Sequence, residues 1–213
     1  MGKPRGFRAP DYEEKRDALL AAISTRAYAD DGATASLAEL ARAAGVTVPT
    51  LRHYFGDRRD VLRAVFAYTA QQARHFIEAQ SHPAGDSFEA SLVAFAQALH
   101  AAWVHHGVGR AIAASLAHGL HSDDLGPCTV EHSLEPSIAA LEARIRSHEA
   151  LGHIALDGDE PRLVALQFLS PLLIALLHQR ELRGAQVRPL DEEAFLTAHA
   201  RRIARAYAPP VAP

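Results

Sequence analysis

At 213 residues, with 48% hydrophobic and 22% charged side chains, the chain has the length and composition of a soluble globular protein with room for one large domain or two smaller ones. A single cysteine, Cys128, permits no internal disulfide, so nothing in the cysteine content argues for secretion or an oxidising compartment. The net charge is −3, but residues 1–64 carry 11 basic against 9 acidic side chains and residues 65–213 carry 11 against 16, so we expect any nucleic-acid contact in the N-terminal part.

Neither the N-terminal residues nor the most apolar run of the chain predicts a membrane protein. The opening residues lack the apolar segment of a signal peptide. The most apolar run, Leu163 to Leu177, spans only fifteen residues and is shorter than a membrane-spanning helix needs to be. We therefore expect a cytoplasmic protein without a membrane partner.

The first elements in chain order are an arm and three helices. Residues 1–11 combine basic side chains with Gly and Pro, which is typical of a flexible basic arm. Apolar spacing predicts a helix from Tyr12 to Asp31, ended by Gly32. Ser36 and Glu39 form a capping box, which predicts a helix that starts there and ends before Gly45.

A second N-cap, Thr47, opens a short helix that reaches about Tyr54, with Pro49 tolerated in its first turn. Asp57 opens a long helix to about Ala79. After a break at residues 82–85, the apolar spacing predicts further helices at 86–105, 108–121, 131–151, 160–183 and 191–207.

The predicted fold class is all-α, with an N-terminal three-helix helix-turn-helix domain and a C-terminal helical domain. The predicted boundaries are a basic arm at 1–11, the helix-turn-helix at 12–56, a connecting helix at 57–80, the C-terminal helical domain at 81–208 and a tail at 209–213.

The segment from Ser36 to Phe55 carries the functional prediction. Two short helices separated by a tight turn that contains a glycine are what a helix-turn-helix requires. Gly45 can adopt a positive φ at the turn, and Val46 and Leu51 would hold the helices together. The opposite face of the second helix would then present its side chains to the major groove. These are Thr47, Val48, Thr50, Arg52 and His53.

The run from Asp17 to about Gln72 resembles the DNA-binding domain of the TetR family. The matching positions are Gly32, Ser36, Leu40, Ala41, Ala44, Gly45, Val46, Thr47, Thr50, Leu51, Tyr54, Phe55, Val61 and Leu62. Three positions depart from the usual pattern: Arg52 replaces tyrosine, Arg58 replaces lysine and Pro49 replaces glycine or lysine.

The resemblance implies a dimer that binds double-stranded operator DNA. We expect phosphate contacts from Ser36, Thr47, Tyr54 and Arg58, and base contacts from Thr50, Arg52 and His53. Arg52 can bind either a guanine edge or a phosphate, and Tyr54 either packs in the core or offers its hydroxyl to a phosphate. Phe55 is expected in the core.

The remaining two thirds of the chain are expected, by the same resemblance, to bind an unknown small-molecule effector and to form a homodimer through the two C-terminal helices. The run 163–177 is apolar on nearly all sides, as a helix between a core and a partner would be. Pocket candidates, each of which a simple core position would also explain, are Phe95, Leu99, His100, Trp103, Leu116, His118, Gln167 and Phe168.

The histidines and the enzyme motifs bear on two other classes of function. Eight of the 13 histidines lie between His100 and His153, and His118 and His121 are one helical turn apart, which suggests a metal-binding or metal-sensing protein as the alternative. No cysteine cluster accompanies them, so no metal site or cofactor is assigned. The motifs of di-iron bundles, serine hydrolases and nucleotide-binding loops are missing, so an enzyme is not expected. The predicted function is a ligand-responsive transcriptional repressor.

Overall fold

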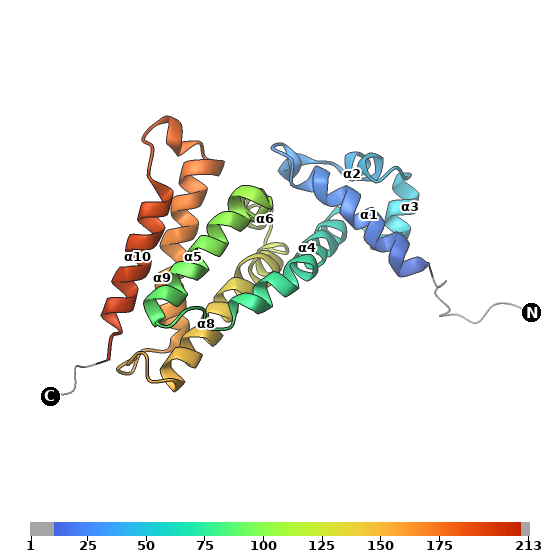
Figure 1. Ribbon diagram of the computed structural model, residues 1–213. Coiled ribbons are helices and arrows are strands. Elements are labelled where there is room, and N and C mark those ends of the chain that lie inside the picture. Colours follow the sequence, from blue (N-terminus) through green and yellow to red (C-terminus); the bar gives the residue numbers. More distant parts are fainter. Residues whose placement is uncertain (1–10, 210–213) are drawn as a thin grey trace, which may run out of the picture. The chain divides into compact units, whose positions relative to one another are not determined.

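The computed structural model describes residues 11–209, which are helical and contain no strand (Figure 1). The predicted all-α fold is therefore confirmed. The predicted basic arm lies outside the described residues except for Asp11, and so does the predicted tail except for Pro209.

The chain divides into two units. The first contains the residues up to Gln72 together with Ala114–Thr129, and the second contains Ala73–Ala113 together with the residues from Val130 onward. The predicted C-terminal helical domain included all of 81–208, whereas Ala114–Thr129 groups with the N-terminal helices. The physical reason is burial, because Leu125 is part of the hydrophobic core of the first unit.

The first unit is built on α1 (Tyr12–Ala27), α2 (Leu37–Ala43), α3 (Val48–Phe55) and the beginning of α4 (Arg58–Gln80) (Figure 1). The end of α6 (Val108–Leu120) and the short helix α7 (Gly126–Thr129) complete it. The largest apolar side chains of its core are Leu20, Ile23, Leu40, Leu51, Val61, Leu62, Val65, Phe66 and Leu125.

The first helix is shorter than predicted, because α1 ends at Ala27 rather than Asp31. The chain turns back at this point, and a 3-10 turn follows at Gly32–Thr34. Gly32 lies so close to the end of α1 that a Cβ at its position would be 2.2 Å from the Ala27 carbonyl oxygen. Glycine is therefore required by a close approach of two backbone segments rather than as a simple helix stop.

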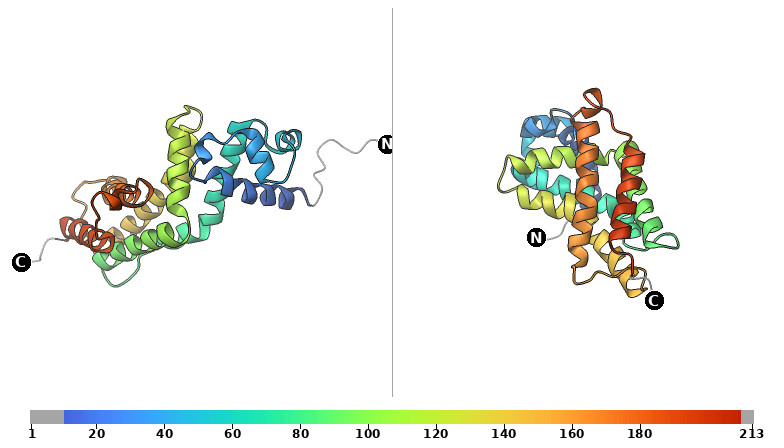
Figure 2. Two further views of the ribbon diagram at one scale, coloured as in Figure 1. Left: turned by 90° about the horizontal axis from the view of Figure 1, so that it is seen from above. Right: turned by 90° about the vertical axis from the view of Figure 1, so that its left-hand side faces the viewer.

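The second unit contains α5 (Phe88–His105), α8 (Glu135–Ala150), α9 (Pro161–Leu176) and α10 (Glu192–Ala206). Helix α8 packs against α9, and α10 packs against both α5 and α9. Figure 2 shows α9 and α10 running side by side. These helices lie within the predicted ranges, while a π-helical turn at Val130–Leu134 connects α7 to α8.

The helix that begins with α9 is longer than its apolar run suggested. It continues through a π turn at Leu177–Glu181, so that the whole helix Pro161–Glu181 is 21 residues long. The mean hydropathy of its most apolar 18 residues is 1.5. Length and composition alone are therefore compatible with a membrane span, and the argument that the stretch is too short was wrong. The core helix of a soluble protein has the same properties, and α9 packs against α8 and α10.

A buried arginine organises the core of the second unit. Arg144 of α8 is 2% exposed, and its Nε donates to the carbonyl oxygen of Gln80 at 2.7 Å. Its Nη1 donates to the carbonyl and hydroxyl oxygens of Ser91 at 2.9 and 3.1 Å, and its guanidinium lies 5.5 Å from the centre of the Phe95 ring. Arg144 therefore joins the end of α4 to the first turns of α5.

Replacing this arginine by an apolar side chain of similar length tests its contribution. We expect Arg144→Met to lower the free energy of unfolding by roughly 2–4 kcal/mol, because buried acceptors on Gln80 and Ser91 lose their donor. Urea denaturation measures the difference. The control is Arg146→Met on the same helix, where the side chain is 61% exposed, and a loss of at most about 0.5 kcal/mol is expected. Equal losses in the two variants would contradict the assigned role.

Candidate nucleic-acid interface

The beginning of α2 is held by the predicted capping box, which the structure confirms. The Ser36 hydroxyl accepts a hydrogen bond from the Glu39 backbone at 3.3 Å, and Glu39 Oε2 accepts one from the Ser36 backbone at 2.7 Å. Arg26 of α1 donates to Glu39 Oε1 at 3.1 Å. The Ser36 backbone and hydroxyl and the Arg26 guanidinium together lower the pKa of Glu39 to about 2. The ionised carboxylate thus joins the start of α2 to α1.

The turn between α2 and α3 depends on two local features. Gly45 has a φ of +67°, which glycine adopts without a steric penalty. The Thr47 hydroxyl then accepts from the Thr50 backbone at 3.3 Å and caps the beginning of α3. Leu51 is completely buried beneath the helix, so α3 is fixed at its start and along its inner face.

The outer face of α3 carries part of the predicted set of base-contacting residues. Arg52 and His53 are exposed, whereas Thr50 is half-buried and its hydroxyl is hydrogen-bonded to that of Thr47 at 2.9 Å. Val48 is half-buried and packs against the core rather than lying free. With 3.6 residues per turn, His53 lies opposite Leu51 and Phe55, and both His53 and Arg52 present exposed polar side chains on this helix.

Tyr54 was expected either to pack in the core or to offer its hydroxyl to a phosphate, and the structure places it between these two positions. It is half-buried, and its ring stacks on Tyr12 of α1 with ring centres 5.2 Å apart. Phe55 packs against the core as expected, and the Arg16 guanidinium lies 5.4 Å from the centre of its ring. Tyr12 and Arg16 were not among the predicted site residues. Their helical phase on α1 could have suggested them, but only the fold brings them to α3.

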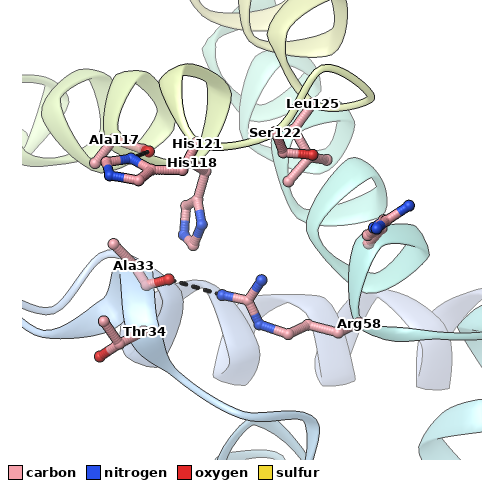
Figure 3. A pocket seen from close by; sticks show the side chains of 9 residues that line it. Ala33, Thr34, Arg58, Ala117, His118, His121, Ser122 and Leu125 are labelled. Carbon is pink, nitrogen blue, oxygen red and sulfur yellow. Dashed lines mark hydrogen bonds between the residues drawn. The ribbon is translucent and has the colours of Figure 1, made fainter.

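Arg58, predicted to bind a phosphate, already has acceptors within the protein. Its Nε donates to the Ala35 carbonyl at 2.6 Å and its Nη2 donates to the Ala33 carbonyl at 2.8 Å (Figure 3). These carbonyls belong to the segment that leads into the α2 capping box. Arg58 therefore joins the first turn of α4 to the entry of the helix-turn-helix, and its phosphate contact stays a prediction.

The eight predicted pocket residues do not form one group. Phe95, Leu99, Trp103 and Phe168 are buried core residues of the second unit. In the same unit, His100 pairs with Glu192 and Gln167 accepts a hydrogen bond from the Tyr207 hydroxyl at 3.1 Å. Leu116 and His118 belong to the first unit, where His118 lines a cavity. Core and pocket positions share the same apolar pattern, which is why the sequence did not separate them.

The metal-sensing alternative has no ligand set in the part of the chain that is described. No three side chains of His, Cys, Asp or Glu within residues 11–209 are placed to hold one ion. His121, one of the two suggested ligands, donates from Nδ1 to the Ala117 carbonyl at 2.8 Å.

Comparison with known proteins now tests the predicted resemblance. Residues 18–65 match the family described as bacterial regulatory proteins of the tetR family, and they include α2, the turn and α3. The resemblance of this segment to the TetR family is confirmed. Proteins of that family are transcriptional regulators and not enzymes. No curated protein sequence matches the chain.

Solved structures of TetR-family regulators have the same fold over nearly the whole chain. A Mesorhizobium loti protein assigned to this family has a TM-score of 0.71 at 21% identity, with 93% of this chain and 96% of that chain covered. The TetR transcriptional regulator from Agrobacterium tumefaciens has a TM-score of 0.65 at 20% identity, with 95% and 97% covered. SmeT, the repressor of the Stenotrophomonas maltophilia multidrug efflux pump SmeDEF, has a TM-score of 0.62 at 18% identity, with 94% of each chain covered.

The lowered pKa of the Glu39 carboxylate leads to a prediction about how the stability of the first unit depends on pH. The pKa of Glu39 is about 2 in the folded protein against an ordinary value of 4.5, so its charge stabilises the fold fully above the ordinary value and loses this effect as the pH falls toward 2. We expect Glu39→Gln to lower the melting temperature at pH 7, and the difference from the wild type to shrink steadily as the pH is lowered below 4.5.

Thermal unfolding followed by circular dichroism between pH 7 and pH 3 measures this difference. Glu149→Gln, at an exposed position at the end of α8, reports the general effect of removing one carboxylate. A Glu39→Gln difference that stays constant over the whole range would contradict the role of the charge.

Proposed function

We propose that this protein is a repressor that binds a palindromic operator as a homodimer and is released from it by a small-molecule effector. The observation that carries the proposal is the outer face of α3, where Arg52 and His53 are exposed behind a capped N-terminus and above a fully buried Leu51. A short, rigid helix with free polar side chains on one face is what major-groove recognition requires.

The proposed contacts divide into two classes. Ser36 and Thr47 are exposed at the N-termini of α2 and α3, where backbone N–H groups and hydroxyls bind phosphates. Tyr54 and Arg58 remain proposed phosphate ligands, with their rings and guanidinium already held by Tyr12 and by two backbone carbonyls. Thr50, Arg52 and His53, with Val48 beside them, probe the bases.

Selection from a genomic fragment library tests operator binding. The purified protein is expected to enrich one palindromic site. Arg52→Ala and His53→Ala are each expected to weaken binding to that site by about 1–3 kcal/mol, roughly 5- to 150-fold, because a base contact is lost. Arg58→Ala is a less clean test, since the variant also releases the Ala33 and Ala35 carbonyls.

Arg146→Ala, an exposed arginine on α8 in the second unit, serves as the control for loss of one positive charge and is expected to leave operator affinity unchanged. An equal loss of operator affinity in Arg52→Ala, His53→Ala and the control Arg146→Ala would contradict specific recognition by α3. Binding that depends on salt but not on sequence would contradict it as well.

The proposed dimer uses the two C-terminal helices α9 and α10. Along α9 an apolar side is left uncovered within the chain, where Leu163 is 45% and Ile174 is 64% exposed. Leu182, just after the π turn, is 70% exposed. Leu163 and Ile174 lie on the same side of α9, with Gln167 and Ser170 also exposed between them. Exposed apolar side chains that share one side of a helix are typical of a surface that pairs with a second copy. A two-fold dimer also presents two recognition helices to two half-sites.

A charged side chain on this exposed side of α9 tests whether it forms the dimer interface. We expect Ile174→Glu to convert the protein from a dimer to a monomer at micromolar concentration, because an unpaired carboxylate would be buried in an apolar interface. Sedimentation velocity measures the change in mass. The matched control is Leu120→Glu, at an 84% exposed position at the end of α6, which should remain dimeric. A wild-type protein that is monomeric under these conditions would contradict the proposal.

Effector release follows from coupling between two binding events. An effector shifts the DNA-binding equilibrium only by its difference in affinity between the two states, typically about 1–3 kcal/mol. The pocket predicted among Phe95, Leu99, His100, Trp103, Gln167 and Phe168 remains a proposal. Four of these side chains are buried in the core, so a ligand there would have to displace them.

A further inference from the structure

A cavity of about 370 Å³ lies within the first unit, bounded by the 3-10 turn Gly32–Thr34, the first residues of α4 and the end of α6 (Figure 3). Its size is at the lower end of the range of about 300–1,000 Å³ that is usual for small-molecule sites. It is lined by Ala33, Thr34, Arg58, Arg59, Ala117, His118, His121, Ser122 and Leu125. None of the residues predicted from the sequence to line an effector pocket is in this group except His118.

His118 is the most unusual member of the cavity. Its ring points from α6 toward Arg58 and Ala33 (Figure 3), the residue is only 3% exposed, and its Nε2 has no hydrogen-bond partner within the described chain. Burial and the nearby positive charge of Arg58 lower the pKa of His118 to about 4, against the opposing effect of a hydrogen bond between the ring and the Ala27 backbone. A buried polar atom without a partner costs free energy unless something binds to it.

The cavity combines positive charge with an apolar wall. Arg58 and Arg59 both lie on its α4 side, and Arg59 Nη1 is 2.5 Å from Asp124 Oδ2. Thr34 and Ser122 add hydroxyl groups, while Leu125 contributes a fully buried apolar side chain. Guanidinium groups pair well with carboxylates, particularly where water is partly excluded.

We propose that this cavity binds a small organic carboxylate with an apolar body. The carboxylate lies between Arg58 and His118 Nε2, and the apolar body packs on Leu125 and the alanines. Nε2 of the imidazole donates to the carboxylate, and protonation of the other ring nitrogen adds a positive charge that the neighbouring carboxylate stabilises.

The effect of such a ligand on DNA binding rests on the proposed function, whereas the carboxylate site itself does not. Arg58 holds the carbonyls of Ala33 and Ala35, directly before the Ser36 cap of α2. A carboxylate that competes for the guanidinium weakens these hydrogen bonds and loosens the attachment of α2 to α4. The ligand thus acts on the helix-turn-helix from within its own unit.

Three probes test the site on the full chain without DNA: benzoate, the uncharged benzamide and inorganic phosphate. By isothermal titration calorimetry, benzoate is expected to bind saturably, and benzamide and phosphate at least tenfold more weakly, because one lacks the charge and the other the apolar body. Equal binding of benzamide, equal binding of phosphate, or no binding of benzoate would each overturn the proposed class of ligand.

Variants at two histidines test whether benzoate binds in this cavity. His118→Leu is expected to weaken benzoate binding at least tenfold, while the control His105→Leu, at an exposed position at the end of α5, leaves it unchanged. Melting curves show whether both variants fold. An unchanged affinity in folded His118→Leu would overturn the assignment.

The pH dependence of the wild type keeps the test independent of that variant. The charged and titratable groups facing His118 are Arg58 and His121. Because the bound carboxylate raises the pKa of His118 from about 4, benzoate affinity is expected to increase as the pH falls from 7.5 to 5.5, by at most about tenfold per pH unit. The His118 ring resonance in NMR spectra should shift on binding, and a resonance unaffected by saturating benzoate would overturn the site.

DNA titrations separate this inference from the proposed function. Loss of operator affinity in the presence of benzoate, absent in His118→Leu, supports the regulatory consequence. Benzoate binding with unchanged operator affinity overturns that consequence and leaves the site standing. Absence of any specific DNA binding refutes the proposed function and not the carboxylate site, which calorimetry measures by itself.

Discussion

The first unit depends on how the backbone between α1 and α2 is satisfied. This segment turns tightly at Gly32, and Ala33 and Ala35 lie in and directly after the 3-10 turn Gly32–Thr34. The two guanidinium donors of Arg58 reach both of their carbonyl oxygens and connect them to the first turn of α4. Arg58 therefore helps to fix the entry to α2, together with the Arg26–Glu39 contact and the buried Leu40, and it also lines the cavity.

The second unit uses the same chemical solution at a different place. Arg144 donates to the Gln80 carbonyl at the end of α4 and to the Ser91 oxygens in α5. An arginine serves well here because its planar donors bind several oxygens at once and its charge is difficult to remove, although burial lowers its pKa. In both units a long-range guanidinium contact closes a break between helices, and α4 takes part in both.

The predictions that held depend on contacts between residues near each other in sequence. Ser36 with Glu39, Thr47 with Thr50 and the turn at Gly45 each involve residues three or fewer positions apart or a single backbone angle. The end of α1 was misplaced because Gly32 is constrained by its approach to Ala27, which is a contact across a turn. The pocket residues could not be separated from the core, because Phe95 and Phe168 have the same apolar spacing in either role.

The sequence by itself determined the helical elements, the capped helix-turn-helix and its resemblance to the TetR family, since caps and amphipathic spacing are local properties of the chain. Only the tertiary structure decided that Arg58 binds carbonyls 23 and 25 residues away, that Tyr54 stacks on Tyr12 and that His118 faces a cavity. These outcomes depend on where separate helices meet. The contacts of a side chain between two helices are set by how the helices pack against each other. The spacing of residues along a single helix does not predict them.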